Sequence, residues 1–212
     1  NPHFSPDGTS VLFSTGNGRD EYYLNSELAM VPVTGGDPVV LTESFDEDTS
    51  AAAWLADGIR FIALDRTHRR LYRLDPESLE IEADRIDGMP RFVWSVDFSA
   101  DERVMVFQGE GPDTLDEIYR MDPGSDRPTR LTTMTEQTEG WPVGSREIVR
   151  WRSTDGAEIE GVVLKPEGFD PKSKHPLLVI IHGGPSWLSF PSRVYSYVYP
   201  VQQWLEKGAV IL

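Results

Sequence analysis

The 212-residue sequence contains no cysteine, which excludes a disulfide scaffold and a thiolate metal site. Its longest apolar runs are about five residues, far short of the roughly 20 that a membrane-spanning helix needs, so we predict no membrane segment. The chain begins with Asn1 instead of methionine. We therefore expect its natural start to lie upstream, which leaves the compartment open between cytoplasm and periplasm.

Lysine is missing from the first two thirds of the chain, and acidic residues dominate there. Residues 1–140 hold 28 Asp and Glu against 12 Arg and no Lys, whereas residues 141–212 hold 7 acidic and 8 basic residues. This difference predicts two segments of different character. The net charge of −15 repels phosphate backbones, so we expect a solvated acidic surface and no nucleic-acid partner.

Three stretches of the first segment share one pattern: an aromatic residue, a short polar turn with Asp, and a short apolar strand. They begin at Phe4 (FSPDG), Trp54 (WLADG) and Phe98 (FSADE), so the aromatic residues lie 50 and 44 residues apart. Asp-Gly between apolar runs is a strong hairpin signal. We therefore interpret the Asp residues of these stretches as turn residues and not as catalytic acids, namely Asp7, Asp57 and Asp101.

A second module recurs between these stretches, a strand, a Gly/Pro/Asp turn and a strand that ends in Leu-Thr. It covers residues 28–42 and 117–132, and residues 71–85 fit it more loosely. Each unit therefore contains about four short strands over some 45 residues, which is the period of β-propeller blades. We predict that residues 1–140 are the C-terminal blades of a β-propeller, with a twisted β-sandwich as the alternative.

From about Trp141 the pattern changes. Residues 147–152 and 158–164 predict an antiparallel hairpin joined by a turn at Asp155-Gly156. Leu177–Ile181 is continuously apolar, which is typical of a strand that is buried on both faces in a sheet covered by helices.

A helix and a further strand follow. Residues 198–207 carry apolar side chains at helical spacing, and Lys207-Gly208 is a typical helix end. Residues 209–212 then begin another buried strand. Strand, helix and strand in this order are typical of an α/β domain, so we predict that residues 141–212 are the truncated start of one.

The apolar run 177–181 leads directly into His182-Gly183-Gly184-Pro185. Where a strand ends, backbone N–H groups lose their ladder partners, and two glycines leave these groups open to a cavity. Such fixed donors can stabilise the oxyanion of an acyl-transfer intermediate. The alternative is a tight turn that needs glycine only for its positive φ.

Residues 151–185 (WRSTDGAEIEGVVLKPEGFDPKSKHPLLVIIHGGP), together with the upstream FSPDG repeat, resemble the prolyl oligopeptidase family of serine peptidases. This family includes dipeptidyl peptidases and acylaminoacyl peptidases. The resemblance implies β-propeller blades followed by the N-terminal part of an α/β-hydrolase domain, with the propeller limiting access to short peptides. It also implies a catalytic serine in a G-x-S-x-G elbow, followed along the chain by Asp and His.

The elbow is absent from this chain, and Gly8-Thr9-Ser10-Val11-Leu12 approaches it but fails at the last position. Because Asp and His follow the serine in this family, we expect the whole triad to lie outside the chain. His182 precedes the position of the nucleophile and is therefore not the triad histidine. The serines close to the glycine pair also lack an elbow and are not expected to be nucleophiles, namely Ser186, Ser189 and Ser192.

The predicted site is therefore the oxyanion-hole segment of an active site, without its catalytic triad. Gly184, and after it Gly183, is expected to supply an oxyanion-hole N–H. His182, Trp187 and Phe190 are expected to line the substrate cleft, with a packing role as the alternative for the last two.

The predicted function is hydrolysis of short peptides through an acyl-serine intermediate by the full-length protein, while this chain alone is expected to be inactive. The alternatives are a propeller-based binding or scaffold module with a degenerate hydrolase remnant, and a carboxylesterase of the same fold. We predict no cofactor and no metal, because His3 and His68 lack metal-ligand spacing and are expected at the surface. Open sheet edges predict association, either as a homo-oligomer or with the remainder of the hydrolase domain.

Overall fold

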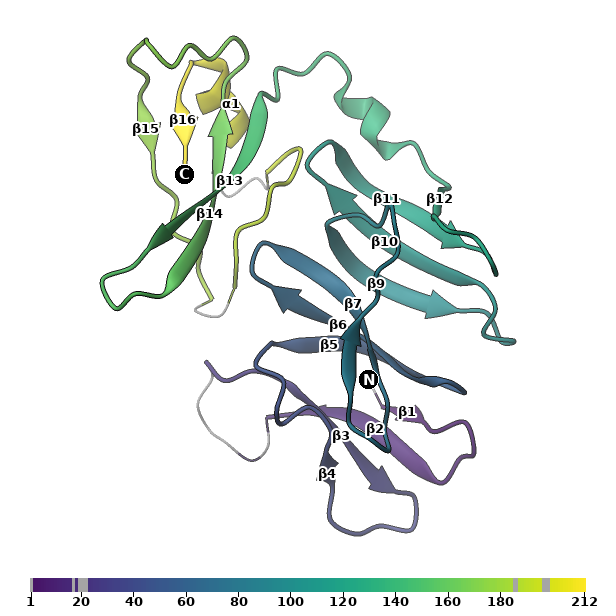
Figure 1. The fold of residues 1–212 in the computed structure, drawn as a ribbon. Coiled ribbons are helices and arrows are strands. Elements are labelled where there is room, and N and C mark those ends of the chain that lie inside the picture. The colour runs from purple at the N-terminus through teal and green to yellow at the C-terminus, as the bar shows by residue number, and fades with distance from the viewer. Residues whose placement is uncertain (1, 17, 19–22, 185–186, 196–198) are drawn as a thin grey trace.

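The computed structural model describes residues 2–16, 18, 23–184, 187–195 and 199–212. Strands dominate it, and the described residues include one α-helix, α1 (Val201–Glu206), and one 3-10 helix, η1 (Met134–Thr138). In Figure 1 the first part of the chain runs from purple to teal, and the last part, in green and yellow, lies beside it.

The first part consists of three consecutive units of four strands, in which each strand pairs antiparallel with the next. A parallel pairing at Arg69 and Phe92 joins the second and third units into one eight-stranded sheet. The first unit is formed by β1 (His3–Phe4), β2 (Ser10–Thr15), β3 (Glu27–Pro32) and β4 (Val39–Val40). The second is formed by β5 (Thr49–Leu55), β6 (Gly58–Asp65), β7 (His68–Leu74) and β8 (Ile81–Ala83). The third is formed by β9 (Phe92–Phe98), β10 (Met105–Gly111), β11 (Thr114–Met121) and β12 (Thr129–Arg130). The prediction of four short strands in each unit is confirmed.

The turns that open these units are built as the sequence pattern predicts. Asp7 accepts hydrogen bonds from the Ser5 hydroxyl at 2.6 Å and from the Thr9 N–H at 3.0 Å. Gly8 closes the turn with a φ of +70°, a conformation that glycine adopts without steric cost. Ser99 and Asp101 repeat this contact at 2.5 Å in the third unit, so these aspartates are turn residues.

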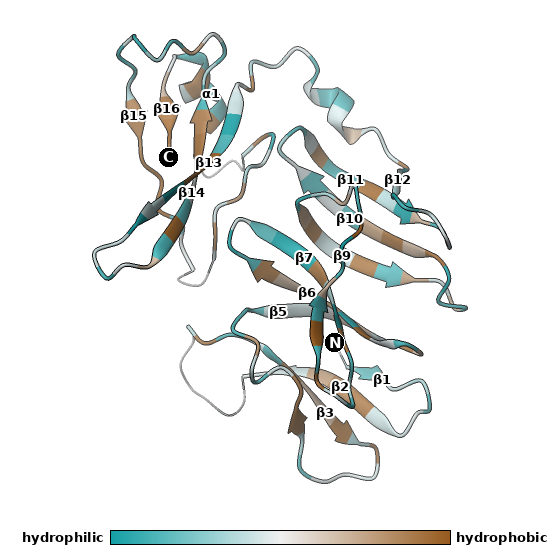
Figure 2. Ribbon diagram, viewed as in Figure 1, coloured by the Kyte–Doolittle hydropathy of each residue, from teal (hydrophilic) through white to brown (hydrophobic). Residues whose placement is uncertain are grey.

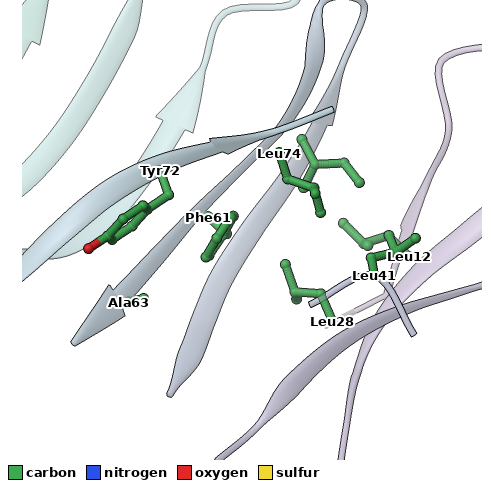
Figure 3. Close-up of a cluster of buried hydrophobic side chains, with 8 residues drawn as sticks. Leu12, Leu28, Leu41, Phe61, Ala63, Tyr72 and Leu74 are labelled. Carbon is green, nitrogen blue, oxygen red and sulfur yellow. The ribbon is translucent and has the colours of Figure 1, made fainter. Parts of the chain in front are cut away.

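Neighbouring units bury their apolar faces against one another. Leu12 and Leu28 of the first unit pack in one cluster with Phe61 and Leu74 of the second, and Figure 3 shows these side chains converging from the two units. A second cluster joins the second and third units, with Ile62 and Leu71 against Val93, Met105, Phe107 and Tyr119. Fully burying a large apolar side chain stabilises a fold by about 1.5–3 kcal/mol, so these clusters hold the first part together.

The last part of the chain is a small mixed sheet with the order β13-β14-β16-β15. Its strands are β13 (Ser145–Arg152), β14 (Glu158–Lys165), β15 (Leu177–Leu178) and β16 (Val210–Ile211). The predicted hairpin is confirmed, since β13 and β14 pair antiparallel over their whole length. β15 and β16 are parallel, as expected for two strands connected through a helix. Val201 and Leu205 of α1 pack on one face of this sheet.

Two details differ from the sequence-based expectation. Only Leu177–Leu178 of the run 177–181 is a strand, and the run alternates: Leu178 and Ile180 pack on the sheet core, whereas Val179 and Ile181 are 54% and 84% exposed. The expectation of burial on both faces is therefore wrong for this chain, because α1 packs on the face of Leu178 and Ile180 while the side chains of the opposite face are exposed. Figure 2 shows the apolar character of β15 and β16 in brown.

The helix is also shorter than predicted. It begins at Val201 and not at residue 198, which lies outside the described residues. Pro200 occupies the N-cap with a ψ of 55°. Proline has no N–H and disfavours helical backbone in the residue before it, so a helix that meets Pro200 starts after it.

Candidate functional site

A cavity of about 1230 Å³ lies between the first part of the chain and the last sheet. One side is lined from β9, β10 and β11, and the other from β13, β14, β16 and the segments 179–183 and 187–195. Most of the lining is apolar, with a small number of polar side chains, which is the usual composition of a ligand-binding cavity.

Three aromatic side chains line one wall of this cavity where the two parts of the chain meet, Trp94, Trp187 and Phe190, and the buried Phe92 packs against Phe190. Phe190 stacks on Phe92 with ring centroids 3.7 Å apart, and Trp187 stacks on Trp94 at 6.4 Å. Phe190 also meets Trp94 edge to face at 5.7 Å. Phe92 and Trp94 lie on β9, so the segment 187–190 is held against the third strand unit by ring contacts.

A buried carboxyl group lies beside this aromatic wall. Glu110 on β10 is 8% exposed and accepts a hydrogen bond from Trp94 Nε1 at 3.2 Å. Burial and the nearby Asp116 carboxylate raise the pKa of Glu110 to about 7, although hydrogen bonds from Ser192 and Trp94 act in the opposite direction. This carboxyl group therefore changes its charge near neutral pH, inside the cavity.

Only one residue of the glycine pair lines the cavity, Gly183, whereas Gly184, expected first as the N–H donor, is not among the lining residues. His182 and Gly183 both line the cavity and, like Gly184, are exposed. Gly184 has a φ of +139°, a backbone conformation that other residues rarely adopt. The His182 ring Nδ1 contacts the Gly183 carbonyl oxygen at 3.1 Å. The chain therefore leaves the strand through a turn that depends on glycine and opens toward the cavity.

Two arginines fix the segment that follows. Arg146 on β13 donates from Nε to the Ser192 carbonyl at 2.6 Å, and also to the Arg193 carbonyl. Arg193 in turn donates to the Thr138 hydroxyl at 2.6 Å, which connects the segment to η1. Tyr195 donates to the Phe190 carbonyl at 2.7 Å. The aromatic side chains on this segment are thus carried by a backbone that is anchored on both sides.

A separate polar contact joins the β13–β14 hairpin to the turn between β6 and β7. Glu160 accepts from the Thr67 hydroxyl at 3.0 Å and pairs with Arg150 at 2.7 Å. Arg66 lies 3.2 Å from Glu158 and 3.5 Å from Glu160. Glu160 contacts Thr67, Arg66 and Arg150, and its side chain is only 6% exposed, so this carboxylate connects the hairpin to the turn.

The structure brings most of the predicted site residues together. His182, Gly183, Trp187 and Phe190 line the cavity, and so do Ser189 and Ser192. Pro185 and Ser186 lie outside the described residues. Sequence patterns do not single out Trp94, Glu110, Arg146 or Arg193, because these residues come from distant strands and only the fold places them side by side.

The two histidines of the first part differ in exposure, and the expected surface position of His68 is wrong. His3 is exposed, but His68 is half-buried, and burial together with the Arg91 charge lowers its pKa to about 4. No group of three metal-binding side chains occurs among the described residues. In the same part of the chain, the helices are too short and too polar to cross a membrane.

Several curated proteins are similar to the chain. Dipeptidyl-peptidase 5 of Porphyromonas gingivalis is 24% identical over 217 residues, which covers 100% of this chain and 30% of that protein. Probable dipeptidyl peptidase 4 of Aspergillus flavus is 26% identical over 183 residues, covering 79% of this chain and 23% of that protein. The chain therefore spans less than a third of the length of these relatives. No family model matches it.

Solved structures share the fold. An acylaminoacyl peptidase in complex with Z-Gly-Gly-Phe-chloromethyl ketone aligns with a TM-score of 0.74 at 19% identity, covering 97% of this chain and 30% of that one. A puromycin hydrolase aligns with a TM-score of 0.65 at 18% identity, covering 99% and 40%. These relatives and neighbours are proteins of the prolyl oligopeptidase family, so the resemblance predicted from the sequence is confirmed.

Proposed function

We propose that this chain is part of a serine peptidase of the prolyl oligopeptidase family. In this proposal the three strand units are blades of a β-propeller, residues 1–140, and residues 141–212 begin an α/β-hydrolase domain. The observation that carries the proposal is the cavity between the two parts, which is lined by His182 and Gly183 on one side and by Trp94 of β9 and Glu110 of β10 on the other. The relatives and structural neighbours are peptidases and hydrolases in name, which supports this reaction class.

The backbone at the glycine pair is the proposed oxyanion arm. Gly184 is exposed, has a φ of +139°, and follows Gly183, which lines the cavity. Its N–H, or that of Gly183, would donate to the oxyanion that forms when a serine attacks a peptide carbonyl. The exposed His182 would line the entrance to this arm and takes no part in proton transfer.

The aromatic wall is the proposed substrate-binding surface. Trp187 is 44% exposed although it stacks on Trp94, so one face of its ring is open to a ligand. Phe190 is more tightly held, because it stacks on Phe92 and also meets Trp94. A short peptide would pack its side chains on this wall, with the first part of the chain limiting access for longer substrates.

The nucleophile is proposed to lie outside this chain, because the sequence contains no G-x-S-x-G elbow. We expect that a fluorophosphonate, which labels activated serines, does not react with the 212-residue chain. It is expected to label a longer protein that includes the elbow. Stoichiometric labelling of the 212-residue chain would falsify the assignment of the triad to another part of the protein.

The oxyanion arm is tested by Gly184→Ala in a longer, active protein. Alanine strains the backbone at this φ and displaces the proposed donor, so kcat should fall by about 10²-fold, the usual effect of losing one such donor. Gly168→Ala is the matched control, since Gly168 also has a positive φ, +65°, with open space around it, in the loop between β14 and β15. An equal loss of kcat in both variants would contradict the proposed role.

A further inference from the structure

A second, smaller cleft of about 290 Å³ lies next to the large cavity. It is lined by Arg91, Pro112, Arg146, Ile148, Arg150 and Pro191. Pro191 lines this cleft, whereas its neighbours Phe190 and Ser192 line the large cavity, so one chain segment separates the two spaces. The cleft is large enough for about ten water molecules or for one small ligand.

Three of the six lining residues are arginines, in a chain with a net charge of −15. Arg146 uses its donors on the carbonyl oxygens of Gly144, Ser192 and Arg193, which are neutral acceptors. Arg91 makes only long hydrogen bonds, at 3.3 and 3.4 Å, to Thr67. Within the described residues, neither arginine lies within ion-pair distance of a carboxylate.

Arg150 differs from the other two arginines. It pairs with Glu160 at 2.7 Å and is 60% exposed in its side chain, so it stands at the rim with part of its charge compensated. Burial lowers the pKa of both Arg91 and Arg146, whereas the Glu160 carboxylate acts in the opposite direction on Arg91 and the Asp113 carboxylate does so on Arg146. Two half-buried cations with no carboxylate within ion-pair distance among the described residues, and a third cation nearby, favour the binding of an anion between them.

We propose that this cleft is a binding site for a small oxyanion, a carboxylate or a phosphate, held by Arg91 and Arg146 with Arg150 at the rim. Guanidinium groups suit this ligand because their planar donors match two oxygens at once. Arg91 precedes β9 in the first part of the chain and Arg146 lies on β13 in the last part. A bound oxyanion would therefore join the two parts and stabilise their contact. This proposal does not depend on the assignment of the peptidase reaction.

The test uses the 212-residue chain and sodium phosphate as the probe. Calorimetric titration and thermal melts are run at pH 7 against sodium chloride of equal ionic strength, so that general screening is subtracted. Phosphate is expected to bind with one site and to raise the melting temperature above the chloride control. No binding beyond the chloride control would overturn the proposal.

Two variants test whether phosphate binds in this cleft. Arg91→Gln should weaken phosphate binding by about tenfold, the equivalent of one charged hydrogen-bonding group. Arg152→Gln is the control, because Arg152 is exposed on the same strand as Arg146 and Arg150 but does not line the cleft. Equal affinities in the two variants would overturn the proposal. If Arg91→Gln does not fold, Arg150→Gln replaces it and should weaken binding by a smaller factor.

The same titration distinguishes the two sources of the oxyanion. A short peptide with a free C-terminal carboxylate is compared with the same peptide as its C-terminal amide, each in competition with phosphate. Displacement of phosphate by the free peptide alone supports a peptide carboxylate as the ligand. Displacement by neither supports a free phosphate ligand, and equal displacement by both contradicts recognition of an oxyanion.

Discussion

The two parts of this molecule bury similar strands in different ways. In the first part, apolar faces of neighbouring units close on each other, and Ile59, Phe61 and Leu74 are completely buried. In the last part, α1 covers one face of the sheet, while Ile181 on the other face is 84% exposed at the large cavity. Within the described residues, the strand units of the first part therefore enclose their apolar side chains, whereas the sheet of the last part is covered on one face.

The largest expected effect lies in the core of the first part. Phe61 is 0% exposed and packs its ring on Tyr72 at 5.5 Å and on Phe45 at 5.6 Å. Phe61→Ala should lower the free energy of unfolding by about 3–5 kcal/mol, because the neighbouring rings cannot fill the cavity left behind. Ile181→Ala is the control on the exposed face and should change it by less than about 0.5 kcal/mol. Urea titrations of both variants measure the two changes in the free energy of unfolding. Similar midpoints for the two variants would contradict the difference in burial between Phe61 and Ile181.

A carboxylate inside the first part should have the next largest effect. Glu117 on β11 is 1% exposed and accepts hydrogen bonds from the hydroxyl and N–H groups of Thr135 at 2.5 and 2.7 Å. It also accepts from the Thr132 hydroxyl at 2.5 Å and the Met134 N–H at 3.0 Å. Glu117→Gln should destabilise the chain by about 2–3 kcal/mol, because a neutral amide accepts these bonds less well and adds a donor that has no place there.

The acid dependence of stability identifies the same group. Burial by itself would raise the pKa of Glu117, but its hydrogen bonds outweigh burial and lower the pKa from 4.5 to about 2. The carboxylate therefore contributes stability above pH 4.5, and this contribution is lost as the pH falls toward 2. Glu117→Gln should remove that decline from the pH profile of thermal melts. Glu136→Gln, an exposed neighbour in η1, should leave the decline in place.

Glu110 provides the opposite case, since it faces the junction between the two parts. Its pKa is raised from 4.5 to about 7, because the buried site favours the neutral carboxyl group. The stability that depends on this neutral form is fully present below pH 4.5 and is lost as the pH rises through 7. Glu110→Gln should therefore stabilise the chain at pH 8, by about 2 kcal/mol, and leave it unchanged near pH 4.5. Thermal melts between pH 4.5 and 8 measure this. A constant difference between variant and wild type across that range would exclude titration of Glu110 as the cause.

The same contrast explains how far the sequence predicted the fold. The repeated Asp turns and the strand-turn-strand module are local patterns, and both correspond to observed turns and strands, as at Asp7 and Gly8. The hairpin of β13 and β14 is likewise local. The environment of 177–181 is not local, because its burial depends on what packs on each face, and the start of α1 depends on the single residue Pro200.

The candidate site shows the same limit. The glycine pair was predictable because its chemistry belongs to one short segment after a strand. Trp94 and Glu110 were not, since each is an ordinary strand residue until the fold brings it against the segment 187–192. The positions of Trp187 and Phe190 at the cavity could be predicted from their distance to the glycine pair, but their ring partners on β9 could not.

The smallest expected effect concerns the contact that joins the two parts. Phe92 and Phe190 stack with centroids 3.7 Å apart and an interplanar angle of 17°. In a double-mutant cycle with Phe92→Leu and Phe190→Leu, the coupling energy should be about 0.5–1.5 kcal/mol, the usual value for an aromatic pair beyond its buried area. Leucine keeps both sites apolar, so the cycle isolates ring stacking from loss of burial. Pairing Phe92→Leu with Leu205→Ala, a substitution in α1, should give no coupling, because Leu205 belongs to the separate cluster of the last sheet. Equal coupling energies in both cycles would show that the stacked rings of Phe92 and Phe190 contribute no specific interaction to the contact between the two parts.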